Sequence, residues 1–327
     1  MDPEFSLNRS HEVHDKLFCN ESSPNVSMQT LITSYMLCVF VGSLSVLIMC
    51  GNCLVIISIM YFKQLHTPTN YLILSLAVSD LLVGVLVLPF SIILSVSSCW
   101  HLTGFLCKIR DLFDAFLCTA SILNLCFISI ERYHVVCQPL TYRTKITARV
   151  TAFMILVSWA GPALIAIIST VLKLKQSVSI TRCNIFQSSR SAIIGAVFLS
   201  FIPAVVIFSV YLKILTVAHR QARSIQSSIK SGAAVSKKEN KATKTLAIVV
   251  GIYLMCWSPY FLSMSFYSVS SDTMPVPMIE AFKWLGWSNS MINPFVYGFF
   301  YKWFRSAFRL IFSGKIFQGD FSDSKLS

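Results

Sequence analysis

The chain has 327 residues, of which 55% are hydrophobic and only 13% are charged. This composition is that of an integral membrane protein and excludes a separate soluble domain. The formal net charge of +13 does not indicate nucleic-acid binding, because the basic residues stand in short loops beside apolar runs. It indicates contact with an anionic lipid leaflet or with a cytoplasmic partner.

The first segment, residues 1–32, is a polar tail. It has no short apolar run behind a basic segment, so we expect no cleavable signal peptide. Its three Asn-x-Ser sequences begin at Asn8, Asn20 and Asn25. Such sequences accept glycan on the outer side of a membrane, so we interpret the tail as extracellular and glycosylated.

Seven apolar runs follow, and about 20 residues in each are enough to cross roughly 30 Å of hydrocarbon. We place these spans near 33–61, 70–97, 104–136, 149–171, 191–216, 243–268 and 279–301. The sequence therefore predicts an all-α membrane protein, a seven-transmembrane helix bundle over 33–301.

Basic residues predict how the bundle is oriented. One set of loops carries Lys63, Arg143 and a dense basic group from Lys213 to Lys244. Because loops rich in Lys and Arg remain in the cytoplasm, these loops are expected inside and the N-terminus outside. We therefore expect a multi-pass protein of the plasma membrane.

Four of the eleven cysteines fall outside the inner parts of the spans. Cysteines within spans act as small buried hydrophobes, whereas those outside are where disulfides persist. Cys107 at the top of span three and Cys183 in the long loop after span four are the pair that we expect. Cys19 with Cys99 is a second pairing that the sequence leaves open.

Span two carries a carboxylate, Asp80, and polar residues of two other spans are expected to converge on it. These residues are Ser121, Asn289, Ser290 and Asn293. Oxygen ligands of this kind suit a small hard cation with water, such as sodium. A hydrogen-bonded polar cluster without any ion is an equal alternative.

Span three carries a second carboxylate, Asp114, seven residues and about two helical turns after Cys107. A carboxylate within a membrane is costly unless it is paired, so it is rarely incidental. We expect no Lys or Arg deep in the other spans to pair with it. A ligand ammonium entering from outside is then its expected partner, and a purely structural acid is the alternative.

Aromatic side chains are expected near this carboxylate. Span six carries Trp257, Tyr260 and Phe261, and span seven carries Trp284 and Trp287 one turn apart. Aromatic faces around a carboxylate form a cage for an organic cation. The alternative is ordinary bundle core, or for Trp284 an interfacial belt.

The inner end of span three reads Glu131-Arg132-Tyr133. Arg132 has Glu131 beside it and Glu239, at the base of span six, as a second expected partner. Competing ion pairs make a two-state switch, whereas a simple interfacial anchor is the alternative. Three prolines add kinks at which spans five to seven can bend: Pro203, Pro259 and Pro294.

The last expected element is an amphipathic helix over 302–313, which alternates aromatic and basic residues at helical spacing. Such a helix lies along the inner membrane interface. Residues 314–327 are expected to form a cytoplasmic tail.

These features together resemble class A (rhodopsin-like) G protein-coupled receptors over nearly the whole chain. The matching motifs are Gly51-Asn52, Leu76-Ala-Val-Ser-Asp80, Glu131-Arg132-Tyr133, Trp159, Cys256-Trp-Ser-Pro259 and Asn293-Pro-Phe-Val-Tyr297. Within that class, the chain resembles the trace amine-associated receptors. That narrower resemblance rests on Trp287, on Asn289-Ser290 and on the ending Tyr301-Lys-Trp-Phe304.

The resemblance implies a receptor rather than an enzyme, with no cofactor beyond a possible sodium ion at Asp80. It implies a protonated biogenic or volatile amine as ligand, a stimulatory G protein (Gs or Golf) that raises cAMP, and a role in olfaction. The implied ligand site is Asp114, Cys118, Trp257, Tyr260, Phe261, Trp287 and Ile185. The implied activation switch adds Tyr211 and Tyr297 to the residues above.

Two further acids are candidates for a second ammonium group: Asp111, one turn before Asp114, and Glu280 at the mouth of span seven. For Asp111 we favour neutralisation by the neighbouring Lys108 and Arg110. A serotonin-like aminergic receptor is the alternative within the class. An amine transporter is the alternative from another class, but it should show discontinuous helices and internal symmetry.

Overall fold

The computed structural model describes residues 28–96, 100–175 and 276–315 and parts of the segments between them. Those parts are residues 203, 205–210, 212–214, 216, 217, 220, 248, 251–263, 265 and 266. The predicted glycosylation sites Asn8, Asn20 and Asn25 lie outside the described residues, as do Cys19, Cys99, Cys183, Ile185, Tyr211 and Glu239.

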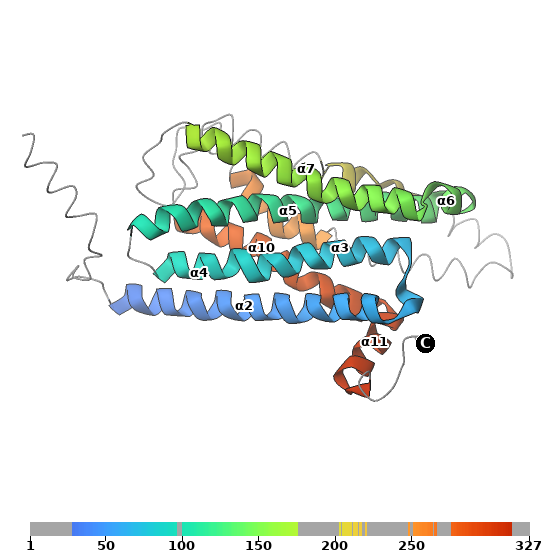
Figure 1. Cartoon of the computed structure of the whole chain (residues 1–327), viewed down its shortest axis with the longest axis horizontal. Helices are drawn as coiled ribbons and strands as arrows, with labels where there is room; N and C mark the ends of the chain where they lie inside the picture. The colour runs from blue at the N-terminus through green and yellow to red at the C-terminus, as the bar shows by residue number, and fades with distance from the viewer. Residues whose placement is uncertain are drawn as a thin grey trace, which may run out of the picture.

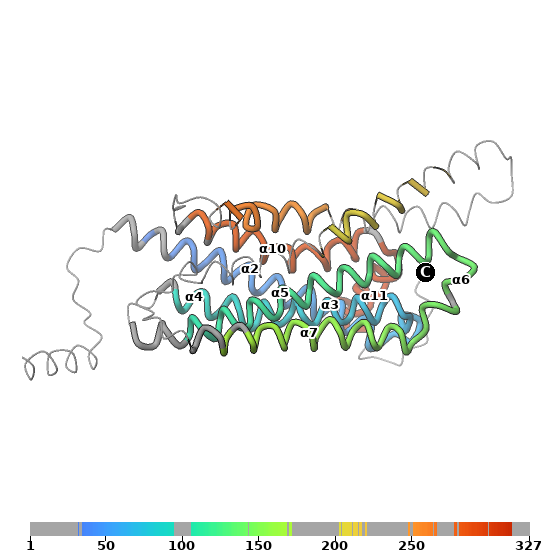
Figure 2. The backbone as a smooth tube through the Cα atoms, turned by 90° about the horizontal axis from the view of Figure 1, so that it is seen from above, coloured from blue at the N-terminus to red at the C-terminus, as the bar shows by residue number. Residues whose placement is uncertain are grey.

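The described part of the chain is helical, and its long helices lie side by side along one axis (Figures 1 and 2). They are α2 (Met28–Tyr61), α3 (Pro68–Leu82), α4 (Leu88–Val96), α5 (Trp100–Cys137), α7 (Ala148–Lys175) and α10 (Val276–Phe300). The short elements are η1 (Lys63–Leu65), η2 (Val83–Val87), α6 (Pro139–Lys145) and α11 (Lys302–Phe312). Helix α5 is central, because it packs against α3, α4, α6 and α7.

Four of the described helical stretches are long and apolar enough to cross a membrane: residues 35–61, 68–94, 106–137 and 148–168. They agree with the first four predicted spans. Helix α10 is more polar, yet its polar side chains Asn289, Ser290 and Asn293 are buried against protein. A membrane helix can carry such groups only when they find partners inside the bundle.

The second span continues from α3 into α4 through a π-helical turn, η2. In this turn the Leu88 N–H bonds the Val83 carbonyl five residues back, and the next residue, Pro89, has no N–H to bond the Gly84 carbonyl in the same way. The Gly84 carbonyl instead accepts a 2.7 Å hydrogen bond from Ser45 of α2. The packing between α2 and η2 thus supplies the partner that the helix lacks.

Helices α2 and α10 cross closely at a glycine and a proline. A Cβ at Gly51 would lie 3.0 Å from Cγ of Pro294, so a larger residue there would require Pro294 to shift by a few tenths of an ångström. Pro294 leaves the Ser290 carbonyl without its helical donor. The Asn52 side-chain amide donates to that carbonyl at 3.1 Å and to the Ile48 carbonyl at 2.9 Å.

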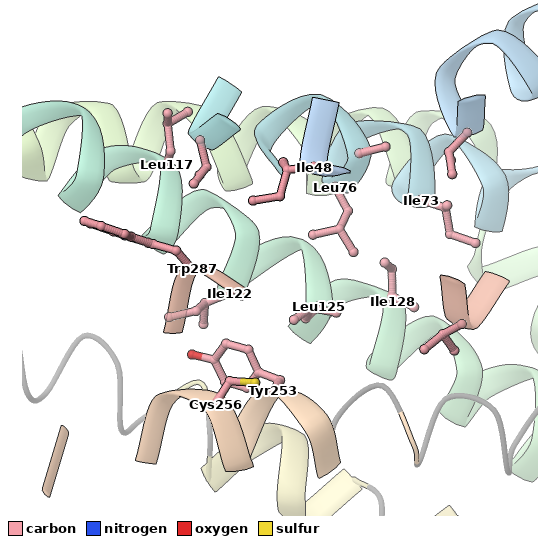
Figure 3. Packing of buried hydrophobic residues seen from close by; sticks show 14 of the residues in the cluster. Ile48, Ile73, Leu76, Leu117, Ile122, Leu125, Ile128, Tyr253, Cys256 and Trp287 are labelled. Atoms are coloured by element: carbon pink, nitrogen blue, oxygen red, sulfur yellow. The ribbon is translucent and has the colours of Figure 1, made fainter. Parts of the chain in front are cut away.

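One hydrophobic core joins the helices. Figure 3 shows Leu76 of α3, Leu117 and Leu125 of α5 and Trp287 of α10 pointing into the same interior. Tyr253, in the described part of span six, faces them from the opposite side. Among the described side chains that are fully buried, Trp287 is the largest.

Helix α11 turns away from the bundle at the end where α6 also lies (Figure 1). It is amphipathic as predicted: Phe304 and Ala307 are fully buried, whereas Lys302 and Arg309 are exposed. The buried face packs against the chain between α2 and α3, at Phe62 and Leu65 among others. The helix ends at residue 312, one residue earlier than expected.

Candidate functional site

Asp114 is the centre of a buried polar cluster between α5 and α10. Its Oδ1 accepts hydrogen bonds from Trp287 Nε1 at 2.7 Å and from Cys118 Sγ at 3.2 Å. Its Oδ2 lies 2.8 Å from Lys283 Nζ. Both carboxylate oxygens therefore have strong donors, and the group is held in one orientation.

The ion pair with Lys283 corrects the expectation that no Lys or Arg lies deep enough to pair with Asp114. The predicted seventh span begins at residue 279, so Lys283 would lie only one turn after the start of that span. The helix in fact begins at Val276, so Lys283 lies about two turns along it. The side chains of Lys283 and Asp114 are only 4% and 11% exposed.

Trp287 contacts both charges of this pair. It follows Lys283 by four residues, so the two side chains share one face of α10. The Trp287 indole N–H binds Asp114, while Lys283 Nζ lies 5.5 Å from the centroid of the Trp287 ring. An indole can thus bind the anion through its edge and the cation through its face.

Asp111, one turn before Asp114 on α5, has a different environment. Arg110 binds Asp111 Oδ1 through Nη2 at 2.9 Å and through Nε at 3.2 Å. Lys283 Nζ lies 3.9 Å from the same oxygen. The Asp111 side chain is 32% exposed, and it is therefore the most accessible acid of the cluster. The other candidate for a second ammonium, Glu280, belongs to α10, but its side chain is outside the described ones.

Three aromatic residues of span six form a compact group. Trp257 stacks on Phe261 with centroids 5.6 Å apart and meets Tyr260 edge-on at 5.9 Å. Trp257 also lies directly on the backbone of α10, because a Cβ at Gly286 would come within 2.7 Å of its ring. This group belongs to the same core cluster as Trp287 and Cys118.

Cys107 is disulfide-bonded, whereas the other described cysteines are free. Its partner is therefore one of the cysteines outside the described residues. The pairing with Cys183 stays a prediction.

Asp80 lies in a second, fully buried polar cluster. Its Oδ1 accepts from Ser121 at 3.1 Å and from Ser290 at 2.8 Å, and its Oδ2 accepts from Asn293 at 2.7 Å. The convergence of α3, α5 and α10 on this carboxylate is the arrangement predicted from the sequence. Asn289, also on α10, has a buried side-chain oxygen with no hydrogen-bond partner.

Glu131 organises the inner end of α5. Its carboxylate accepts hydrogen bonds from Thr69 at 2.7 Å and from Tyr142 at 2.8 Å, and it pairs with Arg132 at 2.6 Å. Arg132 also donates to Thr69. Burial, followed by the nearby Glu131 carboxylate, raises the pKa of Tyr142 to about 12, so Tyr142 remains a hydrogen-bond donor at neutral pH.

The remaining switch residues lie on three different elements. Tyr297 stacks on Phe304 of α11 with centroids 5.8 Å apart, which joins the region after Pro294 to the end of the bundle. Tyr133 meets His134 edge-on at 5.6 Å. Pro259 lies within the helical residues 251–263.

Sequence reasoning assigned no contact to four residues that complete these clusters, although it named Asn52 within the Gly51-Asn52 motif. Thr69 and Tyr142 bind Glu131, Asn52 binds the carbonyl freed by Pro294, and Lys283 binds Asp114. The four-residue spacing of Lys283 and Trp287 was a signal for the last of these. The first three depend on contacts between helices, for which the sequence carries no local signal.

Comparison with known proteins identifies the fold. Residues 51–297 match the family model of the 7 transmembrane receptors (rhodopsin family). This match accounts for the seven-span bundle and makes the protein a multi-pass membrane receptor rather than an enzyme, with a small-molecule ligand and a G protein as partners.

Individual relatives cover most of the chain. Mouse trace amine-associated receptor 4 is 39% identical over 324 residues, which cover 94% of this chain and 93% of the relative. Mouse trace amine-associated receptor 1 is 43% identical over 84% of this chain and 88% of the relative. Human trace amine-associated receptor 5 is 38% identical over 94% of both chains. At this identity and coverage, the chain belongs to the trace amine-associated receptors of the rhodopsin family.

Proposed function

We propose that this receptor binds a ligand ammonium group at Asp114 from the extracellular side and activates a stimulatory G protein of the Gs or Golf type, which raises cAMP. The names of its relatives indicate amines as the ligand class. Glycosylation at the N-terminal tail and a role in olfaction belong to the same proposal.

One observation carries this proposal: an ammonium group already lies at Asp114. The Lys283 ammonium is 2.8 Å from Asp114 Oδ2, with the Trp287 ring beside it. The cluster therefore has the size, charge and aromatic surface that an ammonium requires. A ligand amine would use the same oxygen, while its carbon skeleton would pack on Cys118, Trp257, Tyr260 and Phe261, and on Ile185 in the outer loop.

Activation is proposed to release Arg132 for the G protein. In the structure Arg132 is held by Glu131 and Thr69, as expected for a resting state. Glu239 and Tyr211 are proposed as its alternative partners when span six moves outward. A ligand that binds the released state about tenfold more tightly shifts the equilibrium by about 1.4 kcal/mol.

We also propose a sodium ion in the Asp80 cluster. The carboxylate, two hydroxyl oxygens and the unpaired side-chain oxygen of Asn289 are the hard ligands that such a cation prefers. Among the described residues no group of three or more His, Cys, Asp or Glu side chains is arranged for a metal ion, so every ligand of this site other than Asp80 would be a neutral oxygen.

The amine site is tested with a cAMP assay across an amine panel, on the parent receptor and on Asp114→Ala at equal surface expression. Removing one partner of a buried charge pair costs about 2–5 kcal/mol, so amine potency should fall by about 30-fold or more. Asp323→Asn, a change after α11, should leave potency unchanged. Equal potency on Asp114→Ala and the parent would contradict the assignment.

A further inference from the structure

The acid proposed to bind the ligand is not an open carboxylate, because the receptor's own lysine neutralises it. Lys283 and Asp114 are both almost inaccessible, and the 2.8 Å distance between them is that of a direct ion pair. Any ammonium that reaches Asp114 must therefore separate this pair. What becomes of Lys283 then decides which ligands can bind.

The charges of the described side chains in this cluster are balanced. Among them, Arg110 and Lys283 contribute two positive charges, and Asp111 and Asp114 contribute two negative charges, so their sum is zero. A simple monoamine would add one positive charge without any anion. A buried charge left without a partner is strongly unfavourable, so such a ligand binds at a disadvantage.

Asp111 is poorly suited to become the new ion-pair partner of Lys283. Its Oδ1, 3.9 Å from Lys283 Nζ, already accepts two hydrogen bonds from Arg110. The Arg110 side chain is itself 5% exposed. If Lys283 moved to Asp111, it would have to share that carboxylate with the buried Arg110 side chain.

We propose that the ligand is a zwitterion of the amino-acid type, whose ammonium binds Asp114 and whose carboxylate binds Lys283. Such a ligand replaces one internal ion pair by two intermolecular pairs and leaves the net charge of the cluster at zero. This inference rests on the proposed function, since it uses the same site and the same acid for the ammonium group.

The surroundings favour an aromatic amino acid. Trp257, Tyr260 and Phe261 form a stacked group in the same core cluster as Trp287. An aromatic side chain gains edge and stacking contacts with such a group.

The test compares matched ligands in the cAMP assay: phenylalanine with phenylethylamine, and tryptophan with tryptamine. The methyl ester of each amino acid keeps the ammonium and the bulk but removes the anion. On the parent receptor we expect each free amino acid to be at least about tenfold more potent than its amine and its ester, the ratio that one additional ion pair of about 1.4 kcal/mol provides.

Variants at Lys283 test its role. Lys283→Gln should remove the preference, so that amines and esters gain potency while amino acids lose it. Lys283→Arg keeps the cation and should keep the preference. If it does, loss of the preference in Lys283→Gln is due to the missing charge and not to misfolding. Lys302→Gln, the same change at an exposed lysine of α11, should behave as the parent.

The outcomes separate this inference from the proposed function. If amines equal or exceed amino acids on the parent and lose potency on Asp114→Ala, the zwitterion inference is wrong and the amine receptor stands. If the preference persists in Lys283→Gln, the anion binds elsewhere and the inference is again wrong. If neither ligand class activates the parent, both proposals fail.

Discussion

At the scale of single residues, the partners of each buried acid determine whether that acid can bind a further cation. Asp114 is paired with a cation, whereas Asp80 receives only neutral donors. Neutral hydrogen bonds stabilise an ionised carboxylate less than a cation does. Of the two acids, Asp80 is therefore the one whose ionised carboxylate a small positive ion would stabilise further.

Replacing external sodium with a bulky organic cation should raise agonist affinity of the parent by roughly threefold to tenfold. The reason is that an ion held by the resting arrangement of α3, α5 and α10 stabilises that state. Asp80→Asn should lose this sodium dependence, while Asp111→Asn should keep it. Agonist competition binding in the two salts measures it. A sodium effect of equal size in Asp80→Asn would rule out the site.

At the scale of elements, two breaks in the described membrane helices are each matched by a side chain of a neighbouring helix. The Gly84 carbonyl in η2 receives Ser45, and the Ser290 carbonyl before Pro294 receives Asn52. Both donors come from α2. This helix therefore stabilises the irregular parts of two others, in addition to its apolar packing.

Asn52→Leu should lower the free energy of unfolding by about 1–3 kcal/mol, because the Ser290 carbonyl would be left buried without a donor. A thermal-shift measurement on purified receptor would detect this as a lower Tm. Ser58→Ala is the matched control on α2, since Ser58 binds only a carbonyl of its own helix.

Pro294→Ala restores the missing backbone N–H, so the effect of Asn52→Leu should shrink in that background. If Asn52→Leu lowers Tm by the same amount with and without Pro294, the proposed partnership is absent.

Prediction from sequence succeeded where one helix carries the signal. Apolar length predicted the spans, and buried acids in apolar runs predicted the clusters at Asp80 and Asp114. It failed where the start of a helix determines how deep a residue lies. No Lys or Arg was expected deep in span seven, which was predicted to begin at residue 279, but α10 begins at Val276. A shift of one turn converts an interfacial lysine into a buried partner of Asp114.

Contacts between helices were also beyond the sequence. Thr69 and Tyr142 belong to elements on either side of α5 in the chain, and both bind Glu131. The close approach of Trp257 to the backbone at Gly286 is another contact between two helices. Such pairs depend on how whole helices are rotated against each other, which hydrophobic periodicity does not determine.

At the scale of the whole molecule, three polar clusters follow one another along α5: Asp114 with Lys283, then Ser121 with Asp80, then Glu131 with Arg132. The first two also include residues of α10, and Tyr297 links α10 to α11. A ligand that displaces Lys283 therefore acts on the helix that also carries the middle cluster. This gives a physical route between the ligand site and the inner end of the bundle.

The most direct test of this account is equilibrium binding of a labelled agonist to membranes that carry the parent, Asp114→Asn or Asp114→Glu at equal surface expression. Asp114→Asn keeps the shape of the side chain and removes its charge, so we predict an affinity loss of about 30-fold or more. Asp114→Glu keeps the charge and should retain measurable binding. Affinity of Asp114→Asn within about threefold of the parent, less than 1 kcal/mol, would contradict the central role of this carboxylate.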